Sequence, residues 1–426
     1  MYRTVKQNLI HLSKEDICIL KELTHASKNL VNKTLYEVNK FYQDNPNKEY
    51  LTSNKAYLLV RDNENFKILN SNMGQQIVAS VIDMYACFFK ALSSKKQGKT
   101  SRQINPPEYL PKDGFYPLII EMIPKFVNNE FYVPYSIDYA KTHKRVVIRL
   151  PKVLVGKTIK KIVIVPLHDG RSFEVCYNYI VNEPLQTDDI IRPQNLKVLA
   201  IDLGMNNLAT CVTSTGYSFI IDGRKLKSYI QQCIKINSEI NSLKEKQHLP
   251  RKLTNKQCRI FDKRNNRCRD YIFKATKYII DYCLKEQISL IVIGYTKTFQ
   301  STSINNKRVN QLFKEFPFGQ FVRSLKNSCE KFNITVQLQE ESYTSKASFL
   351  DGDDIPQISS SEQDCKFSGK RVSRGLYKTS LGICINADVN GALNILRKSK
   401  VVPESELTKL YSSGALSTPI RIRIHK

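Results

Sequence analysis

The sequence predicts an α/β protein of more than one domain, with a mixed sheet in its second half and a β-rich module in its first. Its 426 residues are long enough for two or three domains. After residue 196, short apolar strands alternate with long amphipathic helices, which is typical of a mixed α/β sheet. Before residue 182, two helical patterns precede segments with a period of two, which indicates a β module with a helical insertion.

The first half is expected to contain two long helices. One extends over about 13–41 and begins at Ser13 and Asp16, which form a capping-box pattern. The other extends over about 74–92, where apolar side chains recur at helical spacing. Two stretches are assigned to the β module, residues 2–10 and 126–181. A linker is expected at residues 182–195.

The second half begins with the apolar strand 198–201, which ends in Asp202 and is followed by a turn at Gly204. The strand at 288–294 is continuously apolar, and this suits a central position with both faces covered. The other elements are expected at these residues: strands 208–213, 219–221 and 334–338, and helices 226–246, 254–286 and 318–332.

The composition points to a polyanionic partner. The chain has 66 lysines and arginines against 39 acids, a formal net charge of +27, and basic residues occur in every segment. A membrane surface is the rival partner, but no apolar run approaches the roughly 20 residues of a spanning helix. The N-terminus lacks the apolar region of a signal peptide. We therefore expect a cytoplasmic protein that is associated with the nucleoid when bound to DNA. We expect it neither to bind a membrane nor to act on a small-molecule substrate.

The cysteines do not suggest a disulfide framework or a four-cysteine zinc site. There are 11 of them, an odd number, and no Cys-x-x-Cys pair occurs anywhere in the chain. Most are expected to be ordinary buried small residues. The six histidines show no metal-ligand spacing, which disfavours a one-metal zinc mechanism.

Three acidic positions are candidates for a metal site. Asp202 ends an apolar strand, where a carboxylate is costly unless a partner such as a divalent cation compensates it. Glu340 and Glu341 follow the strand 334–338, and Asp388 lies in the first turn of an expected helix. Each has a plainer interpretation: Asp202 caps a tight turn, the glutamates form a solvated strand end, and Asp388 interacts with the positive helix terminus.

The three positions are more informative together. Acids that are distant in sequence and lie at element ends can converge on one edge of a single sheet. Such an arrangement would hold two divalent ions about 4 Å apart and would drive in-line phosphodiester hydrolysis. The expected ions are Mg²⁺, with Mn²⁺ as a substitute, because carboxylate oxygens are hard ligands.

The sequence resembles a known family at this point. Ala200–Gly204 with Asn207, Tyr343–Lys346 and Asn386–Ile395 look like the TnpB family, which are transposon-encoded RNA-guided DNA endonucleases ancestral to the miniature type V CRISPR effectors. The resemblance is strongest after Leu196. It implies an RNase H-like (RuvC-type) α/β nuclease core, preceded by an N-terminal β-barrel-like wedge module with a helical insertion.

The resemblance also implies a catalytic set of Asp202, Glu341 and Asp388. The common family pattern has its glutamate at the end of the strand that here ends in Gly294. A second pattern, shared with the eukaryotic Fanzor relatives, moves the glutamate to just before Thr-Ser-Lys, and Glu341 matches that position. Glu340 is the fallback, since one step along a strand points to the opposite face.

Zinc is not expected in this chain. Relatives commonly carry two Cys-x-x-Cys pairs before the final aspartate, whereas this chain has only Cys365 and Cys384 there. The residues of the intervening segment remain basic and are expected to contact nucleic acid, as is the start of the helix at 254–286. The candidate contacts are Arg259, Lys263, Arg264, Arg267, Lys370, Arg371 and Arg374. The basic C-terminus, 421–426, is an edge strand, an ordered tail, a disordered tail or an RNA-binding segment.

The resemblance divides the chain into these parts: wedge 1–12 and 101–192, helical recognition domain 13–100, nuclease core with helical lid 193–342, nucleic-acid-binding insertion 343–384, last core helix 385–400 and basic tail 401–426. It implies a guide RNA and double-stranded target DNA as partners, with pairing reading the target and the protein reading a short adjacent motif. Two alternatives stay open, a nuclease-inactive RNA-guided DNA-binding repressor and a guide-free nuclease or junction resolvase.

Overall fold

The computed structural model describes residues 2–45, 51–98, 103–181, 197–250, 252–296, 306–356, 366–373, 375–412, 416 and 418–424. The chain separates into two compact units, Met1–Pro184 and Leu185–Lys426. The expected linker at 182–195 and the expected boundary after residue 192 lie outside the described residues. Each unit is described by itself.

Unit 1 (residues 1–184) is built on an antiparallel sheet with the strand order β1-β6-β5-β2. Its strands are β1 (Tyr2–Asn8), β2 (Leu118–Ile120), β5 (Ile159–Leu167) and β6 (Ser172–Ile180). The N-terminal segment pairs with β6, as the sequence predicts. Two further strands, β3 (Glu130–Tyr132) and β4 (Val147–Arg149), form a separate pair. The expected barrel-like closure is not confirmed by these sheets.

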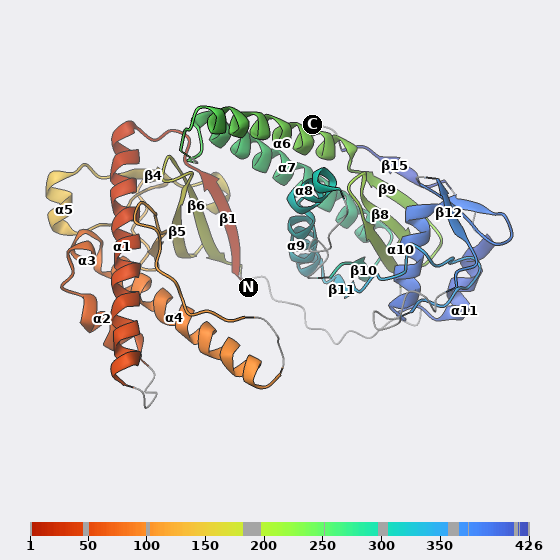
Figure 1. Cartoon of the computed structure of the whole chain (residues 1–426), viewed down its shortest axis with the longest axis horizontal. Coiled ribbons are helices and arrows are strands. Elements are labelled where there is room, and N and C mark those ends of the chain that lie inside the picture. Colours follow the sequence, from red (N-terminus) through yellow and green to blue (C-terminus); the bar gives the residue numbers. More distant parts are fainter. Residues whose placement is uncertain are drawn as a thin grey trace. The chain divides into compact units, whose positions relative to one another are not determined.

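The helices of unit 1 come before most of its strands in the chain (Figure 1). They are α1 (Lys14–Asp44), α2 (Ser53–Val60), α3 (Glu64–Ile68), α4 (Ser71–Lys96) and α5 (Ile137–Thr142), with a 3-10 turn at Lys152–Leu154. The capping box predicted at Ser13 and Asp16 is present at the start of α1. The helices and the sheet share one apolar core, with side chains such as Leu30, Ile77 and Ile162.

One helix differs from the expectation about apolar runs. In the described part of the chain, α4 alone is long and apolar enough to cross a membrane, by length and composition only. Its small residues and few charges raise the mean hydropathy without forming a continuous apolar run. Met73, Ile77 and Val81 of α4 are buried in the core of unit 1, so this helix also serves as a core helix.

Unit 2 (residues 185–426) contains a six-stranded mixed sheet with the order β11-β10-β7-β8-β9-β15. The strands are β7 (Val198–Leu203), β8 (Asn207–Thr213), β9 (Ser218–Asp222), β10 (Leu290–Gly294), β11 (Thr335–Gln339) and β15 (Ile420–Ile422). β10 runs parallel to both of its neighbours, β7 and β11. The predicted central position of the strand that ends at Gly294 is therefore confirmed.

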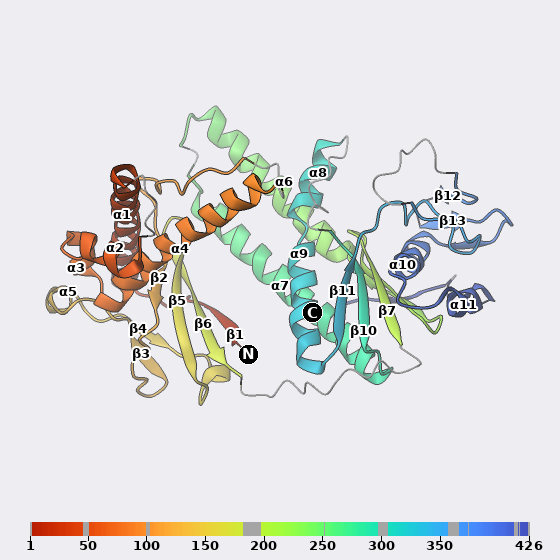
Figure 2. The same cartoon turned by 90° about the horizontal axis from the view of Figure 1, so that it is seen from below.

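Helices cover both faces of this sheet (Figure 2). They are α6 (Arg224–Lys246), α7 (Asn255–Lys285), α8 (Lys307–Glu315), α9 (Phe318–Cys329), α10 (Ala387–Lys398) and α11 (Glu404–Leu407), with 3-10 turns at Glu330–Phe332 and Thr408–Ser412. Odd-numbered β7 residues such as Leu199 pack with α7 and α9, whereas Val198 and Ala200 pack with α10. The alternation along β7 places Asp202 on the α10 face.

A small three-stranded sheet precedes α10 in the chain. Its strands are β12 (Lys370–Ser373), β13 (Leu376–Lys378) and β14 (Cys384–Asn386), in that order and all antiparallel. The buried Tyr377 donates a hydrogen bond from its hydroxyl to the carbonyl of Lys346, 2.7 Å away. This contact ties the small sheet to the loop after β11.

Candidate active site

Asp202 lies at the end of β7, against the N-terminal half of α10. A Cβ atom added to Gly391 would lie 3.0 Å from Oδ2 of Asp202, so the helix approaches the carboxylate closely. Thr210 of β8 lies opposite Asp202 in the sheet, and its hydroxyl is buried with no hydrogen-bond partner. Burial raises the pKa of Asp202 well above its ordinary value, and the charges of Glu341 and Asp388 add to that increase.

Asp388 lies in the first turn of α10, as predicted. Asn386 caps this helix by accepting hydrogen bonds from the backbone of Asp388 and Val389, at 3.0 and 3.2 Å. The carboxylate has its own partners: Asn207 donates from Nδ2 to Oδ2 at 2.5 Å, and Nη2 of Arg371 lies 3.6 Å from Oδ1. Asp388 therefore interacts with side chains of β8 and β12 in addition to the positive end of the helix.

Glu341 follows β11 by two residues and lies beside the end of β10. A Cβ atom added to Gly294 would lie 3.0 Å from Oε2 of Glu341 and 2.4 Å from Cδ1 of Ile395. The carboxylate thus occupies the space next to the position where the common family pattern has its glutamate. Burial raises the pKa of Glu341 to about 7, with a smaller contribution from the charge of Glu340.

Glu340 has a different environment from its neighbour. It accepts a hydrogen bond from Nζ of Lys398 at 2.6 Å and another from the backbone of Ser342 at 2.5 Å. Burial acts to raise the pKa of Glu340, but these hydrogen bonds outweigh it and lower the pKa. Both glutamates lie past the last residue of β11, so strand alternation does not decide between them. The ion pair with Lys398 distinguishes the two environments, because it occupies the carboxylate of Glu340, and the assignment of Glu341 stays a prediction.

Two buried asparagines of α10 hold the loop that follows Glu341. Asn394 donates from Nδ2 to the carbonyls of Thr344 and Ala347, at 2.9 and 2.7 Å. Asn390 bonds the backbone of Ala347 and Phe349. Thr344 in turn donates from its hydroxyl to the carbonyl of Glu341 at 2.8 Å. Sequence reasoning did not assign these roles, although two amides four residues apart in an apolar helix could have suggested them.

The metal-ligand arrangement predicted for the three acids is not formed in this structure. Among the described residues, no group of three or more His, Cys, Asp or Glu side chains is placed to hold a metal ion. The physical reason is visible at Asp388, whose oxygens face Asn207 and Arg371. The donor set still fits Mg²⁺ or Mn²⁺, because all three candidates are carboxylates from different segments. Burial and the charges of Glu341 and Asp388 raise the pKa of Asp202, and the charge of Arg371 offsets only part of that increase.

The predicted nucleic-acid contacts have unequal surroundings. Arg264 forms an ion pair with Glu315 at 2.5 Å, and the guanidinium of Arg267 lies 4.2 Å from the centre of the Tyr229 ring. Arg259 and Lys263 are exposed on α7, and Lys370 and Arg371 are exposed on β12. Arg374 lies outside the described residues. Arg264 therefore links α7 to α8, and Arg267 links α7 to α6, whether or not either one also contacts nucleic acid.

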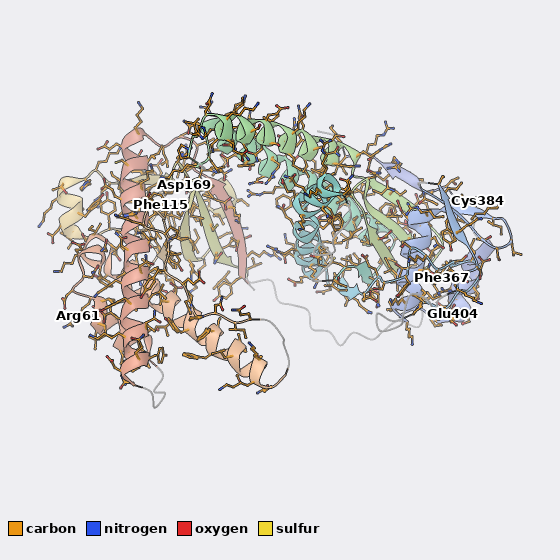
Figure 3. All side chains as sticks on the ribbon, in the orientation of Figure 1. Arg61, Phe115, Asp169, Phe367, Cys384 and Glu404 are labelled. Atoms are coloured by element: carbon orange, nitrogen blue, oxygen red, sulfur yellow. The ribbon has the colours of Figure 1, made fainter. Side chains whose placement is uncertain are left out.

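The segment expected to lack zinc folds into the small β12–β14 sheet. Cys384, labelled in Figure 3, is exposed at the start of β14. Cys365 lies outside the described residues, so the absence of a structural zinc site stays a prediction.

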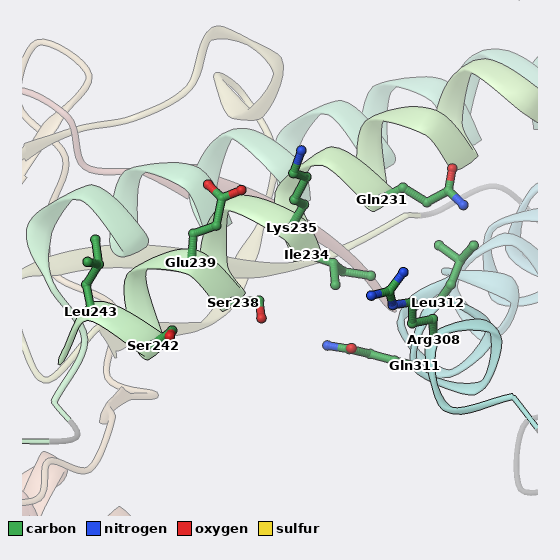
Figure 4. Close-up of a pocket in the computed structure, with 10 residues that line it drawn as sticks. All are labelled: Gln231, Ile234, Lys235, Ser238, Glu239, Ser242, Leu243, Arg308, Gln311 and Leu312. Carbon is green, nitrogen blue, oxygen red and sulfur yellow. The ribbon is translucent and has the colours of Figure 1, made fainter. Parts of the chain in front are cut away.

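A pocket of about 870 Å³ lies between α6 and α8 (Figure 4). Its lining contains the cations Lys235 and Arg308 and the acid Glu239. The remaining lining residues are Gln231, Ile234, Ser238, Ser242, Leu243, Gln311 and Leu312. None of the three candidate catalytic acids lines it, so the pocket is separate from the carboxylate site.

The chain is similar to known proteins in sequence and in structure. Residues 180–300 match the family OrfB_IS605, a probable transposase, and residues 318–395 match the Cas12f1-like TNB domain. The solved structures that resemble the chain include the Cas12f1–sgRNA–target DNA complex (TM-score 0.34, 11% identity, 94% of this chain and 100% of that one). They also include the mini-RNA-guided endonuclease CRISPR-Cas_phi3 (TM-score 0.44, 10% identity, 94% and 92%).

A curated viral protein is also similar. The TnpB-like protein ORF457 of Acidianus two-tailed virus is 23% identical over 240 residues, which cover 55% of this chain. The match covers 49% of the relative, so the chain spans about half the length of that protein. The two family matches and this relative show that the second half of the chain is similar to TnpB-like proteins and to a Cas12f1-like domain.

Proposed function

We propose that this protein is an RNA-guided DNA endonuclease that hydrolyses phosphodiester bonds at Asp202, Glu341 and Asp388. One observation carries the proposal: three acids from segments far apart in the chain lie on the α10 side of one sheet, and the pKa of Asp202 responds to the other two. A net charge of +27 supports a polyanionic substrate. Similarity to TnpB-like proteins supports a nuclease of this type.

The proposed site would hold divalent metal ions through the three carboxylates. Bound Mg²⁺ would supply activation of the attacking water and neutralisation of charge at the scissile phosphate. Nη2 of Arg371 lies 3.6 Å from Oδ1 of Asp388, and its guanidinium is suited to a phosphate. Its role would be to leave Asp388 when DNA enters and to bind the strand being cut.

The glutamate is proposed to act from position 341. A glutamate at the end of β10 would have to displace both Ile395 and the Glu341 carboxylate, as the distances from a Cβ atom at Gly294 indicate. Glycine at 294 and glutamate at 341 are therefore complementary features of one site. The loop bonded to Asn390 and Asn394 would keep Glu341 in place.

Target choice is proposed to come from a guide RNA, with unit 1 reading a short motif beside the target. The resemblance to the TnpB family supports this part. The exposed cations Arg259, Lys263 and Lys370 would contact the nucleic-acid backbone. Binding should therefore weaken steeply as salt is raised.

The test begins with RNA that copurifies with the full chain. Its sequence defines a guide, and matched double-stranded DNA carrying a randomised flank is then incubated with Mg²⁺. We expect guide-dependent cleavage that EDTA abolishes. Asp202→Asn, Glu341→Gln and Asp388→Asn should lose cleavage and keep binding of guide and target, whereas Glu340→Gln should still cut.

Two outcomes would contradict the proposal in different ways. Guide-dependent binding without cleavage by the wild-type chain would indicate a nuclease-inactive DNA-binding protein. Cleavage that needs no RNA would indicate a guide-free nuclease. Full cutting by Glu341→Gln with loss in Glu340→Gln would instead overturn only the glutamate assignment.

A further inference from the structure

We propose that the C-terminal strand β15 completes the active site, because Arg421 fixes the side-chain amide of Asn207 and Asn207 orients Asp388. The inference rests on the proposed function and names a positioning residue for it. The three side chains come from β15, β8 and α10, and Arg421 lies 214 residues from Asn207 in the chain.

The two hydrogen bonds of Asn207 determine which way its amide points. Nη1 of Arg421 donates to Oδ1 of Asn207 at 2.8 Å, and Nδ2 of Asn207 donates to Oδ2 of Asp388 at 2.5 Å. Because a guanidinium only donates, it selects the orientation in which the amide nitrogen faces the aspartate. In the opposite orientation, an amide oxygen would face a carboxylate oxygen, and the two acceptors would repel each other.

The same nitrogen of Arg421 that bonds Asn207 also lies near the carboxylate of Asp222. Nη1 of Arg421 lies 3.6 Å from Oδ2 of Asp222, which is buried at the end of β9. Arg224 also donates to both oxygens of Asp222. Burial acts to raise the pKa of Asp222, but the bonds from Arg224 and the charge of Arg421 outweigh it and lower the pKa. The aspartate is therefore an ionised anchor for the arginine.

The backbone around Asn207 is fixed by close packing. The amide of Gly223 donates to the carbonyl of Asn206 at 2.8 Å, and Nζ of Lys227 donates to Oδ1 of the same asparagine at 3.0 Å. A Cβ atom at Gly223 would lie 2.6 Å from the carbonyl oxygen of Met205, so only glycine fits this corner. The turn between β7 and β8 therefore cannot shift easily to replace a lost side-chain contact.

The expected consequence concerns metal affinity. Groups that hydrogen-bond a carboxylate ligand set its orientation and charge, and their removal costs about 10- to 100-fold in metal affinity. Arg421→Ala should therefore raise the Mg²⁺ concentration for half-maximal cleavage by about tenfold, while the rate at saturating Mg²⁺ falls much less. Arg423, exposed two residues further along, provides the matched control.

The experiment uses the full chain and four variants: Arg421→Ala, Arg421→Lys, Arg423→Ala and Asn207→Ala, with the double variant of Asn207 and Arg421. Binding of Mn²⁺ to the nucleic-acid-free chain is followed by electron paramagnetic resonance, and the Mg²⁺ dependence of cleavage is measured separately. We expect Arg421→Ala to weaken both by about tenfold. Arg421→Lys should restore part of the loss, Arg423→Ala should match the wild type, and the double variant should be no worse than Asn207→Ala.

Several results would overturn the inference. One is that Asn207→Ala and Arg421→Ala weaken Mn²⁺ binding independently, so that their effects add in the double variant. Another is that Arg423→Ala weakens Mn²⁺ binding as much as Arg421→Ala does. The inference also fails if no variant changes Mn²⁺ binding, or if the wild-type chain binds no Mn²⁺. A weaker affinity of Arg421→Ala for nucleic acid, with an unchanged Mg²⁺ requirement, would make Arg421 a phosphate contact instead. Absence of guide-dependent cleavage would refute the proposed function alone, because the Mn²⁺ measurement does not depend on it.

Discussion

The two faces of the unit 2 sheet differ in what they bury. On the face covered by α7 and α9, the strands meet apolar side chains such as Ile279, Phe321 and Leu325. On the α10 face, similar strands meet two fully buried asparagines, with Asp202 and Glu341 near strand ends and Asp388 in the first turn of α10. The candidate site is therefore confined to one face, while the other face supplies an apolar core beneath the same strands.

The α10 face also bears the energetic cost of this arrangement. Thr210 Oγ1 and Asn394 Oδ1 are the buried polar side-chain atoms without a partner in the described part of unit 2, and both lie on this face. Two of its carboxyl groups have raised pKa values. Unsatisfied polar groups and uncompensated charge of this kind are common at functional sites and rare in ordinary cores.

Among substitutions that distinguish the two faces of the sheet, the largest effect on stability and cleavage is expected at Asn394. Asn394→Leu leaves the carbonyl of Thr344 unpaired, at about 1–3 kcal/mol, and removes one of the two hydrogen bonds to the carbonyl of Ala347, which Asn390 still satisfies. It should also release the loop after Glu341, so cleavage should fall and require more Mg²⁺. Denaturant unfolding and the Mg²⁺ dependence of cleavage measure the two effects.

Leu325→Ala, on the opposite face, is the matched control for this change. Truncation of a fully buried leucine should cost a similar free energy of unfolding, about 2–5 kcal/mol. The surviving folded protein should keep its wild-type Mg²⁺ requirement. If both variants raise that requirement equally, the division of labour between the faces is wrong.

A smaller effect is expected at Gly294. The methyl group of Gly294→Ala would overlap Ile395, which is fully buried, and would press on the Glu341 carboxylate. Overpacking of this kind costs about 1–3 kcal/mol. In the double variant with Ile395→Val, the lost methyl should relieve most of that cost. Additive free energies of unfolding for the two substitutions would show that the space above β10 is not shared.

Sequence reasoning located the strands and the two aspartates, because apolar periodicity and an acid at an element end are local signals. The start of α1 followed from Ser13 and Asp16 for the same reason. The environment of Glu340 did not, since its partner Lys398 is 58 residues away. The strands β12–β14 were also missed, because three or four residues carry too little periodicity to predict an element. The nine residues of α8 were missed as well.

Glu340 and Glu341 should respond to substitution with opposite signs. The folded protein holds a proton on Glu341 up to about pH 7, above the ordinary value of 4.5. The raised pKa therefore favours folding in acid, and this contribution is lost as the pH rises from 4.5 through 7. At pH 8, Glu341→Gln should stabilise the metal-free protein by about 1 kcal/mol, after allowance for solvent screening.

Glu340→Gln should destabilise the protein at the same pH, by about 1 kcal/mol, because the ion pair with Lys398 is lost. The pKa of Glu340 is lowered, so its contribution is present above its ordinary range and fades as the pH falls. Thermal unfolding at pH 8 and pH 4 checks both. The two variants should differ most at pH 8 and converge at pH 4, and the same sign for both at pH 8 would contradict the assignment.

The smallest effects are expected on α7, where neighbouring cations differ in their partners. Lys263 is exposed, whereas Arg264 is paired with Glu315. Lys263→Gln should lower the slope of nucleic-acid affinity against salt by about one, which is the loss of one phosphate contact. Arg264→Gln should leave that slope unchanged and should cost up to about 1 kcal/mol in free energy of unfolding. Filter binding at several salt concentrations separates them, and a reduced slope for Arg264→Gln alone would mean that its pair with Glu315 opens when nucleic acid binds.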